Sequence, residues 1–251
     1  MNTNKSDAWI RAVRTKGEKV RLFCFPYAGG GPHIFQGWSK WLPEHVGLYT
    51  VHLPGRGTRM RCAPIDKLHL IVDAVVKALQ PLQDMPFAFF GHSMGALLAF
   101  ETARALRCQR SCGPRLLFAS ACSPPSIIEK QRENIYNLPD EAFIDKIKNL
   151  GGTPPEVLEN KDLLDIMMPT LRADFKAVDT YRYEPAAPLT CPIVIIFGTQ
   201  DDDASGLIME GWNRETTCTL LAHEIQGGHF FIHTAEIELQ KIIINDLRAY
   251  L

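Results

Sequence analysis

The sequence predicts an α/β fold in which a mostly parallel sheet is covered by helices on both faces. Three observations lead to this prediction. Short apolar runs rich in β-branched and aromatic residues alternate with segments of helical periodicity. The chain has 251 residues, of which 46% are hydrophobic, which suits one domain with a sizeable core. Residues 123–188 interrupt the alternation, because no strand-like run occurs there.

The predicted strands lie at residues 20–25, 48–53, 87–91, 115–121, 192–198 and 218–222. Several are nearly uncharged, as is typical of strands buried on both faces of a parallel sheet. Helices are predicted over 66–82, 96–106 and 232–251, where apolar residues recur at intervals of three and four. Because strands and helices alternate, we expect the helices to cover both faces of the sheet.

Residues 124–187 are predicted to form a helical insertion between the two parts of the core, residues 1–123 and 188–251. Apolar residues at helical spacing predict helices over 139–150 and 156–175, and Gly151-Gly152 ends the first of them. A helical insertion over the carboxyl ends of the strands would act as a lid.

The pentapeptide at residues 91–95 has the pattern G-x-S-x-G, with Ser93 at its centre. An apolar run precedes it and a helical pattern follows, which is the strand-to-turn-to-helix setting of an exposed nucleophile. The two glycines fit a turn too tight for a β-carbon. The alternative is a structural serine in an ordinary strand-to-helix turn.

A nucleophilic serine needs a base and a group that orients the base. In this setting the chain order is serine, acid, histidine. Asp201 is the first acid after the apolar run at 192–197, and Asp203 remains an alternative because three aspartates are adjacent. Of the three histidines that follow, His229 alone lies in a Gly-Gly turn, whereas His223 and His233 lie near a strand and in a helix start. We therefore predict that His229 is the general base.

The glycine-rich loop at residues 26–32 follows the first predicted strand. It lacks the Gly-Lys-Ser/Thr ending of a phosphate loop and the G-x-G-x-x-G of a dinucleotide loop. Its expected role is to supply one amide of an oxyanion hole, from Ala28 or its nearest competitor Tyr27. The second amide is expected from Met94, the residue after the serine.

Five motifs together resemble the type II thioesterases, which accompany polyketide, nonribosomal peptide and animal fatty-acid synthases. They lie at residues 25–30 (FPYAGG), 53–57 (LPGRG), 91–95 (GHSMG), 151–154 (GGTP) and 227–231 (GGHFF). The resemblance extends from about Arg21 to the end of the chain. It implies an α/β-hydrolase fold with a helical lid. It also implies hydrolysis of acyl thioesters on the phosphopantetheine arm of acyl or peptidyl carrier proteins.

Carried over by position, the resemblance assigns Ser93, Asp201 and His229 to a catalytic triad, and the amides of Met94 and Ala28 to the oxyanion hole. The sequence departs from the family after Asp201, where Asp202-Asp203-Ala204 stands and the family often has proline. The choice among the three aspartates therefore stays open at this point.

Two groups of side chains have both a functional and a structural interpretation. Met167 and Met168 can line an acyl channel, because methionine adapts to irregular shapes, or can simply pack within the lid. Arg56, Arg59 and Arg61 can contact an acidic carrier protein or its phosphate, but pairing with nearby carboxylates is the favoured interpretation.

Composition excludes several classes of protein. The net charge of −1, from 27 basic and 28 acidic residues, is not that of a nucleic-acid or membrane-surface protein. No apolar run is long enough to span a membrane, and the polar N-terminus has no secretory signal. Seven cysteines, several in apolar strands, indicate reduced thiols in the cytoplasm. No metal site or cofactor is expected. The oligomeric state is open, with a monomer favoured.

The predicted function is removal of misprimed or stalled acyl groups from carrier domains by a Ser-His-Asp mechanism. One alternative is an esterase or acyltransferase for small free substrates. Another is a non-catalytic carrier-binding module, against which the complete set of three groups argues.

Overall fold

The computed structural model describes residues 9–109, 112–128, 133–153, 155–201 and 206–250. Its centre is a seven-stranded sheet in the order β1-β3-β2-β4-β5-β6-β7. The edge strand β1 pairs antiparallel with β3, and every other strand pair is parallel. The strands are β1 (Ile10–Arg14), β2 (Val20–Phe25), β3 (Val46–Val51), β4 (Phe87–His92), β5 (Leu116–Ser120), β6 (Ile193–Gly198) and β7 (Leu220–Ile225).

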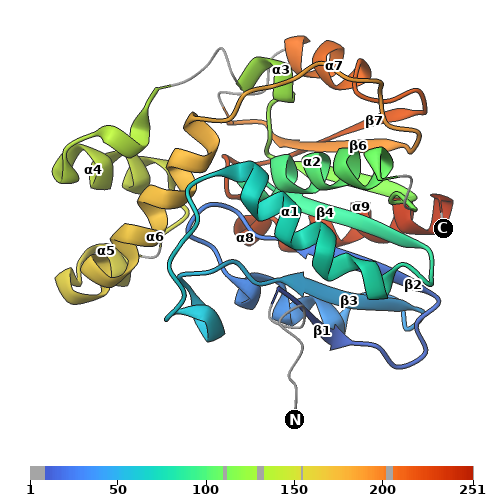
Figure 1. Ribbon diagram of the computed structural model, residues 1–251, viewed down its shortest axis with the longest axis horizontal. Helices are drawn as coiled ribbons and strands as arrows, with labels where there is room; N and C mark the ends of the chain where they lie inside the picture. Colours follow the sequence, from blue (N-terminus) through green and yellow to red (C-terminus); the bar gives the residue numbers. More distant parts are fainter. Residues whose placement is uncertain (1–8, 110–111, 129–132, 154, 202–205, 251) are drawn as a thin grey trace.

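Helices cover both faces of the sheet, as predicted (Figure 1). Side chains alternate along each strand, so Phe23 and Phe89 pack on one face with α1 (Leu68–Leu79) and α2 (Met94–Cys108). Leu22 and Phe90 pack on the other face with the 3₁₀ helix η2 (Pro32–Lys40) and with α9 (Glu236–Tyr250). Two further helices are α7 (Gly206–Asn213) and α8 (Phe231–Thr234). The alternation explains why these strands are apolar throughout.

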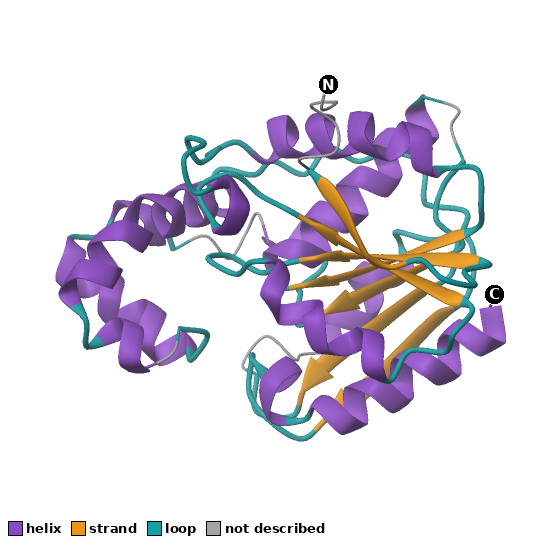
Figure 2. Ribbon diagram, turned by 90° about the horizontal axis from the view of Figure 1, so that it is seen from below, coloured by secondary structure: helices purple, strands orange, loops and turns teal. Residues whose placement is uncertain are grey.

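The described part of residues 124–187 contains helices and no strand. The helices are α3 (Pro125–Ile128), η5 (Ile135–Asn137), α4 (Asp140–Leu150), α5 (Pro155–Leu158) and α6 (Lys161–Asp179). The helices α4, α5 and α6 lie together beyond one end of the sheet in both views (Figures 1 and 2). Phe143 and Ile147 of α4 and Leu171 of α6 form a small apolar cluster that is separate from the two faces of the sheet.

Three features differ from the elements predicted above. Strand β1 was not predicted, because it is an exposed edge strand with only Ile10 buried. The helix predicted over 156–175 is divided into α5 and α6, since Asn160 caps α6 by accepting a hydrogen bond from the Leu163 amide. Helix α6 also continues to Asp179, although Pro169 lies inside it.

Candidate active site

Ser93 lies in a sharp turn between β4 and α2. Its backbone angles are φ 54° and ψ −122°, a left-handed conformation that costs energy for a residue with a β-carbon. The Ser93 amide donates to the carbonyl of Ser120 at 2.8 Å, which ties the turn to the end of β5. The strained turn presents the hydroxyl beyond the carboxyl end of the strand, where α/β sheets place their ligands.

The two glycines of the pentapeptide are required by close backbone contacts. A β-carbon on Gly91 would lie 2.2 Å from the carbonyl oxygen of Gly95. A β-carbon on Gly95 would lie 2.2 Å from the carbonyl oxygen of Phe25, at the end of β2. Helix α2 therefore starts directly against the chain that leaves β2, and this brings the glycine-rich loop beside Ser93.

The loops after β6 and β7 are joined by backbone contacts. Thr199 donates its amide to Ile225, and Gln200 donates its amide to Gly227, both at 2.9 Å. Gly198 allows this approach, because a β-carbon there would lie 2.4 Å from the Gly227 carbonyl oxygen. Asp201 and His229 are thereby held on neighbouring loops.

His229 bridges Asp201 and Ser93. Its Nδ1 lies 2.9 Å from Asp201 Oδ2, and its Nε2 lies 2.9 Å from Ser93 Oγ. Because a carboxylate only accepts hydrogen bonds, Nδ1 carries the hydrogen of the neutral ring and Nε2 accepts from the serine hydroxyl. The side chains of His229 and Asp201 are mostly buried, at 18% and 11% exposure. The arrangement can remove the proton from Ser93 as its oxygen attacks a carbonyl.

Of the predicted acids, Asp201 contacts His229, while the alternative Asp203 lies outside the described residues. Neither of the other two late histidines contacts Ser93 in the described structure. His223 pairs with Asp246 at 2.9 Å, and His233 contacts the Tyr27 hydroxyl at 2.8 Å.

The ring of His92 holds the backbone of His229 by a hydrogen bond, a role that the sequence analysis missed. His92 Nε2 donates to the main-chain carbonyl of His229 at 2.9 Å, and His92 Nδ1 lies 2.9 Å from Ser120 Oγ. Burial lowers the pKa of His92 well below its usual value, with neighbouring His229 adding to the effect. His92 is therefore neutral. The sequence pattern that could have indicated this role is an apolar strand that ends in histidine, since a buried imidazole needs hydrogen-bond partners.

The glycine-rich loop begins at the end of β2. Tyr27 is buried, and its ring packs edge-on against Phe230, the neighbour of His229. Burial raises the pKa of Tyr27 to about 12, so the phenol stays protonated, and its oxygen lies 2.8 Å from His233 Nε2. Ala28 is half-buried, and the Tyr27 carbonyl accepts from the Gly30 amide at 2.9 Å. Met94 is the first residue of α2, so its amide is free of helical pairing and can act as a donor.

The three arginines have different environments. Arg56 is buried and forms a two-point ion pair with Asp174 of α6, at 2.5 and 2.7 Å. Arg59 lies over the ring of Trp9 and donates to the His52 carbonyl at 2.7 Å. Arg61 is exposed. Arg56 thus has the carboxylate partner that the favoured interpretation expects, whereas Arg59 contacts a main-chain carbonyl and an aromatic ring. Asp174 was missed, although an acid on the apolar face of a helix indicates a buried partner.

Met167 and Met168 are both half-buried and pack against the apolar cluster of Phe143, Ile147 and Leu171. They thus contribute to packing within the insertion.

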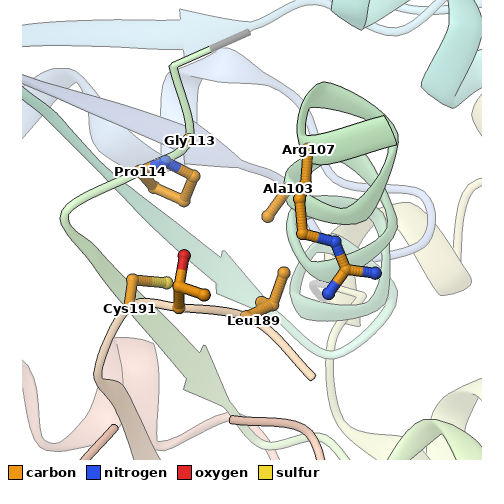
Figure 3. A pocket seen from close by; sticks show the side chains of 7 residues that line it. Ala103, Arg107, Gly113, Pro114, Leu189 and Cys191 are labelled. Carbon is orange, nitrogen blue, oxygen red and sulfur yellow. The ribbon is translucent and has the colours of Figure 1, made fainter. Parts of the chain in front are cut away.

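A cavity of about 230 Å³ lies at the far end of α2 from Ser93. Ala103 and Arg107 of α2 line it, together with Pro114, Leu189 and Cys191 from two loops (Figure 3). Helix α2 has 15 residues and a rise of about 1.5 Å per residue, so this cavity is separate from the serine site.

Within the described ranges, no three metal-binding side chains are grouped as a metal site would require. No helix among these residues is long and apolar enough to cross a membrane.

Comparison with known proteins identifies the family. The sequence profile of the thioesterase domain matches residues 20–249. The gramicidin S biosynthesis protein GrsT of Aneurinibacillus migulanus is 37% identical over 243 residues, covering 97% of this chain and 94% of its own. A protein of Brevibacillus parabrevis named linear gramicidin dehydrogenase LgrE is 40% identical over 247 residues, covering 97% and 94%. That name describes an oxidoreductase, but this chain has no G-x-G-x-x-G dinucleotide motif.

Among solved structures, the thioesterase RedJ from the prodiginine pathway of Streptomyces coelicolor has a TM-score of 0.85 and 36% identity. The match covers 91% of this chain and 90% of RedJ. The expected α/β-hydrolase fold is confirmed, and so is the resemblance to type II thioesterases. The chain therefore belongs to the thioesterase family of hydrolases, which act on acyl thioesters.

Proposed function

We propose that this enzyme removes acyl groups from the phosphopantetheine arm of acyl or peptidyl carrier proteins in polyketide or nonribosomal peptide synthesis. The observation that carries this proposal is the bridging position of His229, 2.9 Å from both Ser93 and Asp201, in a chain of the thioesterase family. Relatives named for gramicidin S and prodiginine biosynthesis support the choice of pathway. We expect the enzyme to work in the cytoplasm, as the cysteines in its apolar strands suggest.

In the proposed mechanism, Ser93 Oγ attacks the thioester carbonyl while His229 Nε2 takes the hydroxyl proton. Asp201 holds the ring and stabilises the imidazolium that forms. The carbonyl oxygen becomes negatively charged, and the amides of Met94 and Ala28 donate to it. When the tetrahedral intermediate collapses, the carbon–sulfur bond breaks and His229 returns the proton to the thiolate. Water then attacks the acyl-serine by the same steps, which releases the acid and restores Ser93.

The test compares one acyl group on two carriers, a phosphopantetheinylated carrier protein and the free pantetheine thiol. We expect a higher kcat/KM with the carrier protein, because contacts with the protein add to binding of the transition state. Equal efficiency on both would favour the small-substrate esterase instead. Transfer of the acyl group to an added alcohol faster than to water would favour an acyltransferase.

The Ser93→Ala variant serves as the control for chemistry. It should fold normally, bind the acylated carrier protein and lose both hydrolysis and labelling by a fluorophosphonate. If the wild-type protein binds the carrier but releases no acid, a non-catalytic binding module is the better description. Residual turnover within about tenfold of wild type in Ser93→Ala would remove Ser93 from the mechanism, since loss of a triad member costs several orders of magnitude.

A further inference from the structure

Asp174 of α6 is a charged side chain in the interior, with 1% exposure. Its Oδ2 accepts a hydrogen bond of 2.7 Å from the amide of Gly29, in the glycine-rich loop. The two residues are 145 positions apart, and Asp174 lies in the helical insertion whereas Gly29 follows a core strand. Burying a carboxylate costs desolvation free energy, and hydrogen bonds and an ion pair must offset that cost.

Arg56 holds the Asp174 carboxylate in one orientation. Its Nη1 and Nη2 donate to Oδ2 and Oδ1, and its Nη1 also donates to the Gly30 carbonyl at 3.1 Å. A two-point pair of this kind has little rotational freedom. One turn earlier in α6, Thr170 Oγ1 donates to the Gly55 carbonyl at 2.9 Å. The helix is thus attached by buried polar contacts to the loop that follows β2 and to the loop that follows β3.

The Gly29 amide belongs to the peptide group that follows Ala28. Fixing this amide fixes the plane of the Ala28–Gly29 peptide and therefore limits the rotation of Ala28. Gly29 has a φ of 75°, and a β-carbon there would lie 2.4 Å from Leu171 Cδ2, so the loop and α6 are in close contact. Because Asp174 occupies the Gly29 amide, that amide is also unavailable to a substrate oxygen.

We propose that Asp174 is a positioning residue that sets the oxyanion-binding loop from the helical insertion, so that the loop is competent only when α6 is seated. This inference rests on the proposed function, in which the Ala28 amide is a donor to the oxyanion. Displacement of α6 breaks the bond between Asp174 and Gly29 and releases the loop. Catalysis is thereby coupled to the position of the insertion.

Removal of Asp174 alone would leave Arg56 buried and unpaired, which destabilises a protein strongly. The test therefore uses two double variants, Arg56→Met/Asp174→Asn and Arg56→Met/Asp174→Leu. Both lack the ion pair, and asparagine and leucine have nearly the same shape. Only asparagine retains an oxygen that accepts from the Gly29 amide.

We expect kcat of the leucine variant to be about 10- to 100-fold below that of the asparagine variant, because outright loss of an oxyanion donor costs about 10²–10³. KM should differ less than about twofold, since the oxyanion forms only in the transition state. Affinity for a trifluoromethyl ketone, which forms a tetrahedral oxyanion on serine, should fall in parallel with kcat/KM. Affinity for the free acid product should not change. A general loss of structure would instead lower kcat, the affinity for the ketone and the affinity for the acid together.

Equal kcat and equal ketone affinity in the two folded variants would overturn the inference. If either variant does not fold, amide hydrogen exchange of the wild-type protein decides. Gly29 should then be as protected as the amides in the middle of α6, and a rapidly exchanging Gly29 amide would overturn the inference. The rate of fluorophosphonate labelling needs no carrier protein. It therefore separates failure of the coupling from failure of the proposed substrate.

Discussion

His92 and His229 are linked by a single hydrogen bond from the ring of the first to the backbone of the second. His92 Nε2 donates to the carbonyl oxygen of His229, and these two atoms are 2.9 Å apart. The residue directly before Ser93 thus holds the residue whose ring contacts Ser93. The bond requires one particular neutral tautomer of His92, because the carbonyl only accepts.

The buried His92 ring predicts a loss of stability in mild acid. Its pKa is lowered on folding, so the unfolded chain binds a proton more readily than the folded protein. The unfolding free energy is therefore unaffected by His92 above the unfolded pKa of about 6.5, and it decreases as the pH falls below that value. Between pH 6.5 and 5, the unfolding free energy of wild type should fall by up to about 1.4 kcal/mol per pH unit relative to His92→Gln.

Urea unfolding at several pH values measures this difference, and effects of the other histidines cancel between the two proteins. His69→Gln is the control, because it removes an exposed histidine on α1 and leaves the buried His92 in place. Parallel curves for wild type and His92→Gln would show that His92 is not held neutral.

The contact between Asp201 and His229 predicts the effect of Asp201→Asn. An asparagine amide can donate to Nδ1 and so favours the wrong tautomer of the ring. We expect kcat to fall by about 10⁴, as in other triads. Asp202→Asn and Asp203→Asn should each change kcat far less in steady-state assays. If Asp203→Asn loses activity and Asp201→Asn keeps it, Asp203 is the residue that orients His229.

Gly95 is predicted to tolerate no side chain. In Gly95→Ala the new carbon would meet the Phe25 carbonyl, a backbone atom that cannot move without disturbing β2. We expect unfolding free energy to fall by about 2 kcal/mol or more and kcat to fall with it. Gly37→Ala is the matched control, since a β-carbon there would meet no described residue within 4 Å apart from its neighbours along the chain. Equal thermal midpoints for the two variants would contradict the close contact.

Met167 and Met168 carry a prediction about chain length. If they contact the acyl group, Met→Trp at either position should lower kcat/KM for long acyl chains more than for an acetyl thioester, because added bulk shortens the channel. A chain-length series on carrier-bound and free thioesters measures this. An unchanged profile would leave both residues with only the packing role that their position against the cluster of Phe143, Ile147 and Leu171 indicates.

The local sequence pattern was enough to predict those elements whose structure depends on residues close together in the chain. The apolar strands, the amphipathic α1 and the G-x-S-x-G turn follow from periodicity and from the steric freedom of glycine. The order of Ser93, Asp201 and His229 followed from where each lies relative to a predicted strand. Edge strand β1 escaped prediction because an exposed strand carries little apolar signal.

The chain alone thus determined the alternating fold, the family motifs and the candidates Ser93 and His229, and it preferred Asp201 while leaving Asp203 open. Only the tertiary structure decided how the supporting residues pair. Arg56 meets Asp174 across 118 positions, and His92 meets His229 across 137. Such pairs leave no periodic trace in the sequence, because they depend on which loops and helices pack together. Because an unpaired polar group is costly to bury, buried charged and imidazole groups such as Arg56 and His92 pair with groups that the fold brings beside them.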